Sequence, residues 1–516
     1  MCDELNRLME RLEQWRVHQA LRVSTSAQIA AFHLTALTEE KSRVYGMNGF
    51  LLRQSSLAAH VQMRDDIFAL EWALRGLTLP DPELMLIERL RDSWRESVAE
   101  TAVDVLKNIA SYCVVRDLVI CAKRGGYLVH TPSDSEFHFT DPPSWTGTND
   151  VKSRLIAERI SLDRNPLSGS VSPADFSLDD TSMREDFPQD IQCTSYSGSD
   201  FWALWKHIHG LCVDRILEDC RIRNYGTFAA TSETKELGIL VTKRKLIDEV
   251  VRATGVEKAT VSTFLDWLTF NFQTPRKFSL FHCPLVEVNE KFVLIAPHTV
   301  LMAHSPTIFL RQLAHHDKAV YDACSSEMEK RSLRHLKAHI EGDDRVVHTG
   351  VKLRTTDGEM ELDVVEYDKS RSILSIGEAK FSVRPDSASE VDHENDVLAE
   401  GVEQLKRNRG VLLGKGDALE SLLVRVGAAS DQAVEVMYFL LPTRFTGSDF
   451  LDIPTWTMVL PIEFCLRPQC KGQALRSIWA DYRKLWESSD EEVRSARSEE
   501  EFEIAGFKII YPAFKV

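Results

Sequence analysis

The segment from Gly358 to Phe381 constrains the fold of this chain most, because it carries charged side chains on two runs that otherwise alternate like buried strands. The two runs flank DKSRS, a polar sequence typical of a β-hairpin turn. With a four-residue loop at Lys369–Ser372, antiparallel pairing predicts that Asp363 lies directly opposite Glu378. Lys380 follows two residues later and therefore projects from the same face of its strand as Glu378.

These three charged residues have apolar neighbours, namely Leu362, Val364, Ile376 and Ala379. Charge on core strands is costly unless it binds a cation or pairs with an opposite charge. Two carboxylates suit a hard divalent cation such as Mg²⁺, and a bound cation of this kind activates water and polarises a phosphoryl oxygen. A lysine beside it can stabilise charge that develops in the transition state. The trio therefore favours metal-dependent phosphodiester hydrolysis.

Asp363 followed by Glu378-Ala379-Lys380 on a hairpin resembles the PD-(D/E)xK superfamily, the fold of many restriction endonucleases and resolvases. The resemblance covers roughly residues 320–445, about a quarter of the chain. It implies a helix with an acidic residue, then three strands, then another helix. It also implies that Asp363, Glu378 and the Ala379 carbonyl bind Mg²⁺, which Mn²⁺ can replace, and that Lys380 is the catalytic lysine.

Two further positions follow from the same resemblance. The family's first helix often carries a metal-binding Glu, and here Glu327 and Glu329 compete. Helical spacing places Glu329 within the apolar face of Leu333, Leu336 and Ile340, so Glu329 is the predicted ligand. Some exonuclease-like branches carry a Gln on the later helix, which corresponds to Gln404, followed four residues on by Tyr; here that position is Asn408.

Basic residues cluster beside this glutamine. Lys406, Arg407 and Arg409 supply local positive charge that suits phosphates, and we expect them to bind nucleic acid.

The same residues allow two other interpretations. One is a structural ion pair, Asp363–Lys380 or Glu378–Lys380, on an edge hairpin. The other is a catalytically inactive nuclease fold that serves as a nucleic-acid-binding or regulatory scaffold. Convergence of all four side chains on one point would favour the enzyme.

The rest of the chain predicts an α+β multidomain protein. We expect a helical N-terminal region over residues 1–130, a loop-rich connector over 131–198, a helical and winged-helix-like middle over 199–315, and a restriction-endonuclease-like α/β domain with a central mixed sheet over 316–516. Within the last region, Trp456–Phe464 is predicted as a strand, and the acidic residues 488–503 as a solvated loop or helix.

The middle region contains two short predicted helices around Gly255, followed by strands over 284–288 and 291–296. The second helix exposes Glu257, Lys258, Ser262 and Asp266, which favours a structural helix-turn-helix over one that contacts phosphates.

Composition limits the partners. Lys plus Arg is 62 against 78 for Asp plus Glu, a net charge of −16, so any nucleic-acid contact must use a local basic surface. We expect no membrane partner and a cytoplasmic location, because no long apolar run or secretion signal is found and the cysteines lack paired spacing.

The expected function is Mg²⁺-dependent cleavage of nucleic acid, with DNA as the expected substrate, in a bacterial restriction or antiphage defence effector. A homo-oligomer or a protein activator is compatible with this expectation.

Overall fold

The computed structural model is a mixed α/β protein with three sheets that divides into two compact units. It describes residues 2–141 and 191–514, except 25, 53–55, 78–86, 124, 194, 223–236, 272, 276–277, 304, 356–357, 382, 384–387, 415–416, 429–432, 444–452 and 485–496. No helix in these ranges is long and apolar enough to cross a membrane. The first unit holds the described residues up to 318 and those from Arg497 onward, and the second holds those between Ala319 and Ala496.

The first unit begins with helices, as expected for residues 1–130. They are α1 (Cys2–Ala20), α2 (Ala27–Leu52), α3 (Ser56–Leu74), α4 (Ile87–Asp92) and α5 (Glu96–Lys123). Helices α1, α2 and α3 all contact α5. A four-stranded sheet follows, formed in the order β1-β2-β13-β12 by β1 (Leu128–Ser133), β2 (Glu136–Thr140), β12 (Arg497–Ile504) and β13 (Phe507–Phe514).

The middle of the chain also belongs to the first unit. Its elements are α8 (Gly198–Ile222), β3 (Ile239–Thr242), α9 (Lys243–Thr254), α10 (Lys258–Leu268), β4 (Thr269–Phe270), β5 (Leu285–Glu287), β6 (Phe292–Ile295), α11 (Pro297–Met302) and α12 (Ser305–His316). Thr242 caps α9 by accepting from the Lys245 N–H, and Gly255 ends it at a φ of 75°. The predicted helix pair and β-hairpin are therefore present.

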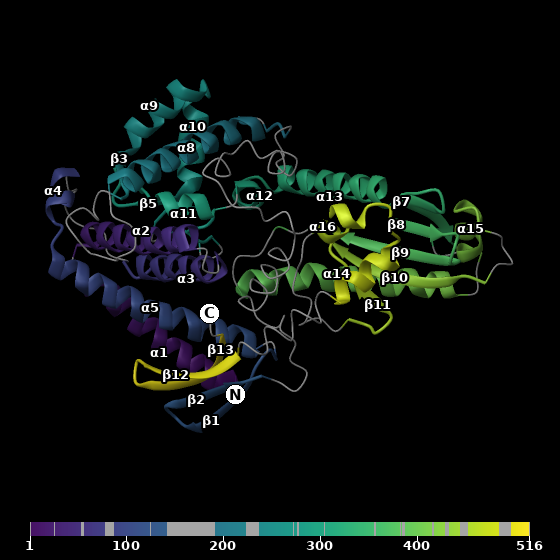
Figure 1. The fold of residues 1–516 in the computed structure, drawn as a ribbon, viewed down its shortest axis with the longest axis horizontal. Coiled ribbons are helices and arrows are strands. Elements are labelled where there is room, and N and C mark those ends of the chain that lie inside the picture. The colour runs from purple at the N-terminus through teal and green to yellow at the C-terminus, as the bar shows by residue number, and fades with distance from the viewer. Residues whose placement is uncertain are drawn as a thin grey trace. The chain divides into compact units, whose positions relative to one another are not determined.

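The second unit is a five-stranded mixed sheet between helices (Figure 1). Its elements are α13 (Lys318–Ile340), β7 (Arg345–Thr355), β8 (Gly358–Asp368), β9 (Ile373–Lys380), α14 (Ala388–Leu413), α15 (Ala418–Arg425), β10 (Glu435–Pro442), β11 (Thr457–Val459), α16 (Ile462–Cys465), a 3₁₀ turn (Pro468–Cys470) and helical residues 475–484. The strand order is β11-β10-β9-β8-β7. Strands β7, β8 and β9 are antiparallel, whereas β9, β10 and β11 run parallel.

Two core clusters cover the two faces of this sheet. Leu374 and Ile376 of β9 pack with Leu398, Val402 and Leu405 of α14. Ile373 and Ala379, on the other face of β9, pack with Leu333, Leu336 and Ile340 of α13. The sheet is thus held between α13 and α14, and both helices pass near the end of β9.

The domain limits differ from the expected ones in two places. The region 316–516 is not one domain, because β12 and β13 belong to the first unit, where β13 pairs in parallel with β2. The expected connector 131–198 contains most of the β1–β2 hairpin, and its residues 142–190 lie outside the described residues.

Two predicted elements near the C-terminus are also wrong. The acidic stretch 488–503 ends in strand β12, because Phe502 and Ile504 alternate with the exposed Glu501 and Glu503 and pair with β13. The predicted strand Trp456–Phe464 stops at Val459, since Pro461 cannot donate to a ladder and instead begins α16.

A buried glutamate sets a pH dependence for the second unit. The Glu366 carboxylate accepts from the Leu475 N–H at 3.1 and 3.2 Å, and burial raises the pKa of Glu366 to about 7. The native state therefore keeps a proton that the unfolded chain releases near its ordinary pKa of about 4.5. The free energy of unfolding that protonated Glu366 contributes is fully present below pH 4.5 and is lost as the pH rises through 7.

We predict that Glu366→Gln removes this titration. The free energy of unfolding of the variant, relative to wild type, should rise between pH 5 and pH 8 by on the order of 2–3 kcal/mol. Urea unfolding of both proteins at four pH values measures it. Other buried carboxyl groups cancel in the difference, so parallel pH curves for the two proteins would contradict the prediction.

Candidate active site

The β8–β9 hairpin has the predicted turn and register. Asp368 Oδ1 accepts from the backbone N–H groups of Ser370 at 3.0 Å and Arg371 at 3.2 Å, which closes the turn. Pairing runs from Asp368 opposite Ile373 to Val364 opposite Gly377. One further step in this register sets Asp363 opposite Glu378, as the sequence predicts.

The two strands stop pairing at this point. Asp363 Oδ2 accepts from the Ala379 N–H at 2.8 Å, in the place where a backbone carbonyl would continue the ladder. Strand β9 meanwhile continues beside β10 as far as Lys380. Because the N–H and C=O of a strand residue point to the same side, the Ala379 carbonyl also faces β8.

Lys380 projects from the same face as Glu378. Its Nζ donates to Glu378 Oε1 at 2.7 Å, and only 16% of its side chain is exposed. The stem of Lys380 lies against Gly401 of α14, where an added Cβ would stand 3.1 Å from Lys380 Cε and 3.2 Å from Cγ. A glycine on the helix thus allows α14 to cross directly over the lysine.

Glu329 reaches the same place from α13. Its Oε2 accepts from the Phe381 N–H at 3.1 Å, just past the end of β9. Glu327, the competing candidate, is exposed and pairs with Arg334 at 2.8 Å. Of the two candidates, Glu329 is therefore the one whose side chain reaches the end of β9, through the backbone of Phe381.

The three carboxylates influence one another electrostatically. Burial and the charge of Asp363 raise the pKa of Glu378 to about 7. Burial, followed by the same neighbour, raises the pKa of Glu329, and burial raises that of Asp363. Lys380 opposes these shifts in all three groups. Three carboxylates and one ammonium leave a formal charge of −2 when all are ionised, which a divalent cation would neutralise.

The donor set suits Mg²⁺ in part. Asp363, Glu378 and the Ala379 carbonyl are hard oxygen donors, and Mg²⁺ commonly takes one or two carboxylates and keeps several waters. However, within the described ranges no three His, Cys, Asp or Glu side chains are arranged to hold one metal ion. The residues therefore fit a site of two carboxylates and a carbonyl, with Glu329 outside direct coordination.

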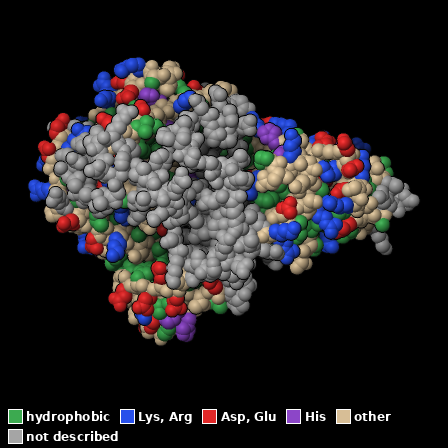
Figure 2. Space-filling model, in the orientation of Figure 1, with side chains coloured by type: hydrophobic (Ala, Val, Ile, Leu, Met, Phe, Trp, Pro, Cys, Tyr) green, Lys and Arg blue, Asp and Glu red, His purple; other side chains and the backbone are tan. Residues whose placement is uncertain are grey.

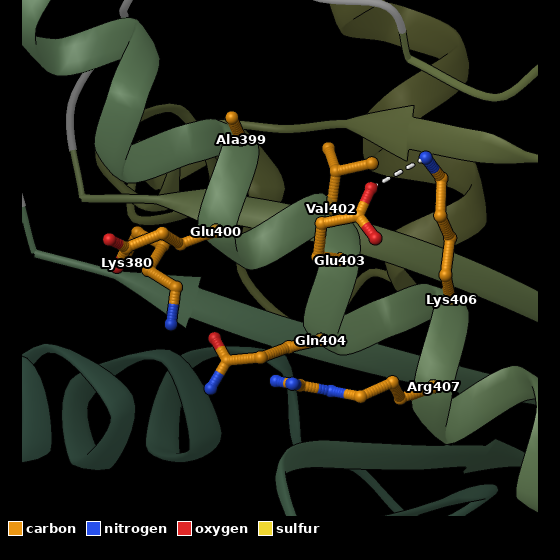
Figure 3. Close-up of a pocket in the computed structure, with 8 residues that line it drawn as sticks. All are labelled: Lys380, Ala399, Glu400, Val402, Glu403, Gln404, Lys406 and Arg407. Atoms are coloured by element: carbon orange, nitrogen blue, oxygen red, sulfur yellow. Dashed lines mark hydrogen bonds and ion pairs between the residues drawn. The ribbon is translucent and has the colours of Figure 1, made fainter.

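An open groove of about 610 Å³ begins at Lys380 and follows α14. It is lined by Lys380, Ala399, Glu400, Val402, Glu403, Gln404, Lys406 and Arg407. Figure 3 shows the Lys380 amine and the Gln404 amide pointing toward each other, with Arg407 extended beside Gln404. Lys and Arg side chains gather on the face of the second unit that Figure 2 shows.

The three basic residues predicted to bind nucleic acid have different surroundings. Lys406 Nζ donates to Glu403 Oε1 at 2.7 Å. The Arg409 guanidinium lies 4.8 Å from the Trp456 ring centroid and does not line the groove. The sequence did not predict the groove residues Glu400 and Glu403 or the contact of Gly401 with Lys380, although Glu400 lies one helical turn before Gln404 and shares its side of the helix.

The helix pair α9–α10 has the features of a structural element. Phe264, Leu265 and Leu268 of α10 are buried, and Lys258 pairs with Asp248 of α9 at 2.7 Å.

Comparisons with known protein families, with curated proteins and with solved structures give no match for this chain.

The close approach at Gly401 gives a test of how tightly the site is packed. An added Cβ would lie 2.7 Å from Leu440 Cδ1 as well as against Lys380, so Gly401→Ala must shift both side chains. We expect the free energy of unfolding to fall by about 1–3 kcal/mol, despite the higher helix propensity of Ala. Urea unfolding measures this loss.

Gly410 provides the matched control on the same helix, because nothing lies within 4 Å of its added Cβ. Gly410→Ala should be neutral or stabilising by up to about 1 kcal/mol. Equal effects of the two substitutions would show that Gly401 is not a packing constraint.

Proposed function

We propose that this chain is a metal-dependent nuclease that hydrolyses phosphodiester bonds, with DNA as its substrate. One observation carries the proposal: Glu329, Asp363, Glu378 and Lys380, from three separate elements, are held by hydrogen bonds around residues 378–381, where β8 and β9 part and an open groove begins. Perturbed carboxyl groups beside a groove with basic residues are typical of a catalytic site.

The order of elements supports a restriction-endonuclease-like assignment for the second unit. The sequence α13-β7-β8-β9-α14 puts an acid on the first helix and the Asp and Glu-Ala-Lys residues on the second and third strands. This is the arrangement that the PD-(D/E)xK resemblance implies. The winged-helix-like assignment of β3, α9, α10, β5 and β6 is likewise part of the proposal.

Each residue has a role that its position allows. Asp363, Glu378 and the Ala379 carbonyl would hold Mg²⁺ or Mn²⁺, which would polarise the phosphoryl oxygen and lower the pKa of a bound water. Lys380 would orient the attacking water and stabilise charge on the phosphoryl group. Glu329 holds the Phe381 backbone, and Gln404 faces the Lys380 amine across the groove.

The biological setting that we propose is a bacterial restriction or antiphage defence effector in the cytoplasm, which acts with an activator or as a homo-oligomer. This part rests on analogy with nuclease domains joined to other large regions.

A second function is favoured by the Glu378–Lys380 ion pair, in which the lysine ammonium already neutralises one of the two carboxylates proposed to hold the metal. In that case the second unit is an inactive nuclease fold that binds nucleic acid or regulates a partner.

We predict that wild type cuts plasmid or linear DNA with Mg²⁺ or Mn²⁺. Lys380→Ala and Asp363→Ala should each reduce the rate at least 100-fold, because the first removes charge stabilisation at the reacting group and the second removes a metal ligand. A gel assay on plasmid, linear and single-stranded DNA and on RNA measures this. Calorimetric titration with Mn²⁺ should show binding by wild type and none by Asp363→Ala.

Glu329→Gln and Glu327→Gln form a matched pair on α13. The first should lower the cleavage rate, and the second should leave it unchanged because Glu327 is exposed and remote from the site. Absence of both cleavage and Mn²⁺ binding in wild type would support the inactive scaffold. Mn²⁺ binding without cleavage would indicate that an activator is required.

A further inference from the structure

The groove beside Lys380 contains one basic side chain that the fold leaves available for a ligand. Lys406 Nζ pairs with Glu403 Oε1 at 2.7 Å, and the Arg409 guanidinium lies over the Trp456 ring and does not line the groove. Arg407 is exposed, lines the groove and makes no ion pair or hydrogen bond with any described residue. Of the three neighbouring cations on α14, Arg407 is therefore the one that lines the groove and can bind an anion without giving up a contact with another described residue.

The position of Arg407 on α14 sets how far along the helix it lies from the point where Lys380 packs. Lys380 packs against Gly401, and Arg407 lies six residues further along the same helix. At about 1.5 Å per residue this is about 9 Å along α14. Successive phosphates of one strand lie farther apart along that strand than their axial rise of about 3.4 Å, so the interval corresponds to one or two nucleotides.

We propose, on the basis of the nuclease function above, that one DNA strand follows α14 from Lys380 to Arg407, and that Arg407 binds the phosphate one or two nucleotides from the bond that is cut. The guanidinium suits a phosphate because it can donate two parallel hydrogen bonds. Arg407 is thus a positioning residue that aligns the strand, and it takes no part in the chemical step.

Glu400 places a limit on the path of the strand. It is exposed in the groove, one turn before Gln404, and its charge repels a phosphate that approaches there. The DNA strand is therefore attracted at the Arg407 end of the groove and repelled near Glu400.

The first test is binding of a fluorescent 20-nucleotide DNA duplex in EDTA, where a metal-dependent enzyme cannot cut, followed by anisotropy over a range of salt. Arg407→Ala should weaken binding about tenfold and reduce the slope of log affinity against log salt by about one. Lys406→Ala and Arg409→Ala should leave the slope unchanged. Arg407→Lys should retain the slope, and Glu400→Gln should tighten binding two- to threefold.

The second test locates the contact. Neutral methylphosphonate is placed at one position at a time, and loss of affinity is measured for wild type and Arg407→Ala. At the phosphate one or two nucleotides from the cut, the methylphosphonate should weaken binding by wild type and leave binding by Arg407→Ala unaffected, since both changes remove the same contact. In cleavage assays Arg407→Ala should raise KM and leave kcat unchanged.

The outcomes separate the two proposals. If wild type cuts DNA but Arg407→Ala and Lys406→Ala have equal effects, or no methylphosphonate position depends on Arg407, this inference is wrong and the nuclease function stands. If wild type neither binds nor cuts nucleic acid, both are wrong. A gain in affinity with Glu400→Gln supports the proposed path without relying on a loss of function.

Discussion

The hydrogen bond from the Ala379 N–H to the Asp363 carboxylate is the contact on which the second unit's site depends. It replaces a backbone ladder bond at the point where β8 leaves β9, so the strands separate without leaving the Ala379 N–H unpaired. The same contact orients the Asp363 side chain and, through strand geometry, turns the Ala379 carbonyl toward it. The site therefore begins at the same residues at which β8 and β9 stop pairing.

The two helices that cover the sheet complete this arrangement from opposite faces. Helix α13 is anchored by Leu333, Leu336 and Ile340, and it extends past the sheet far enough for Glu329 to bond the backbone after β9. Helix α14 packs on the other face and crosses Lys380 at Gly401. Burial between these helices raises the pKa of the carboxyl groups, and Lys380 provides the opposing charge.

Charge is distributed unevenly in a chain whose net charge is −16. The basic side chains of α14 differ in what they contact: one pairs with Glu403, one stacks on Trp456 and one faces the groove. A count of basic residues in sequence treats them as equal. Their side-chain surroundings separate them, because a phosphate must compete with Glu403 for Lys406 and with the Trp456 ring for Arg409.

The sequence by itself determined the hairpin, its register and which of the two glutamates of α13 faces the end of β9, since turn chemistry and side-chain periodicity depend on neighbouring residues. Tertiary structure decided the rest. Pairing of β13 with β2 joins distant parts of the chain and overturned the expected limit of the last domain. The partner of Arg409 and the need for glycine at position 401 likewise depend on residues from other elements, which no local pattern records.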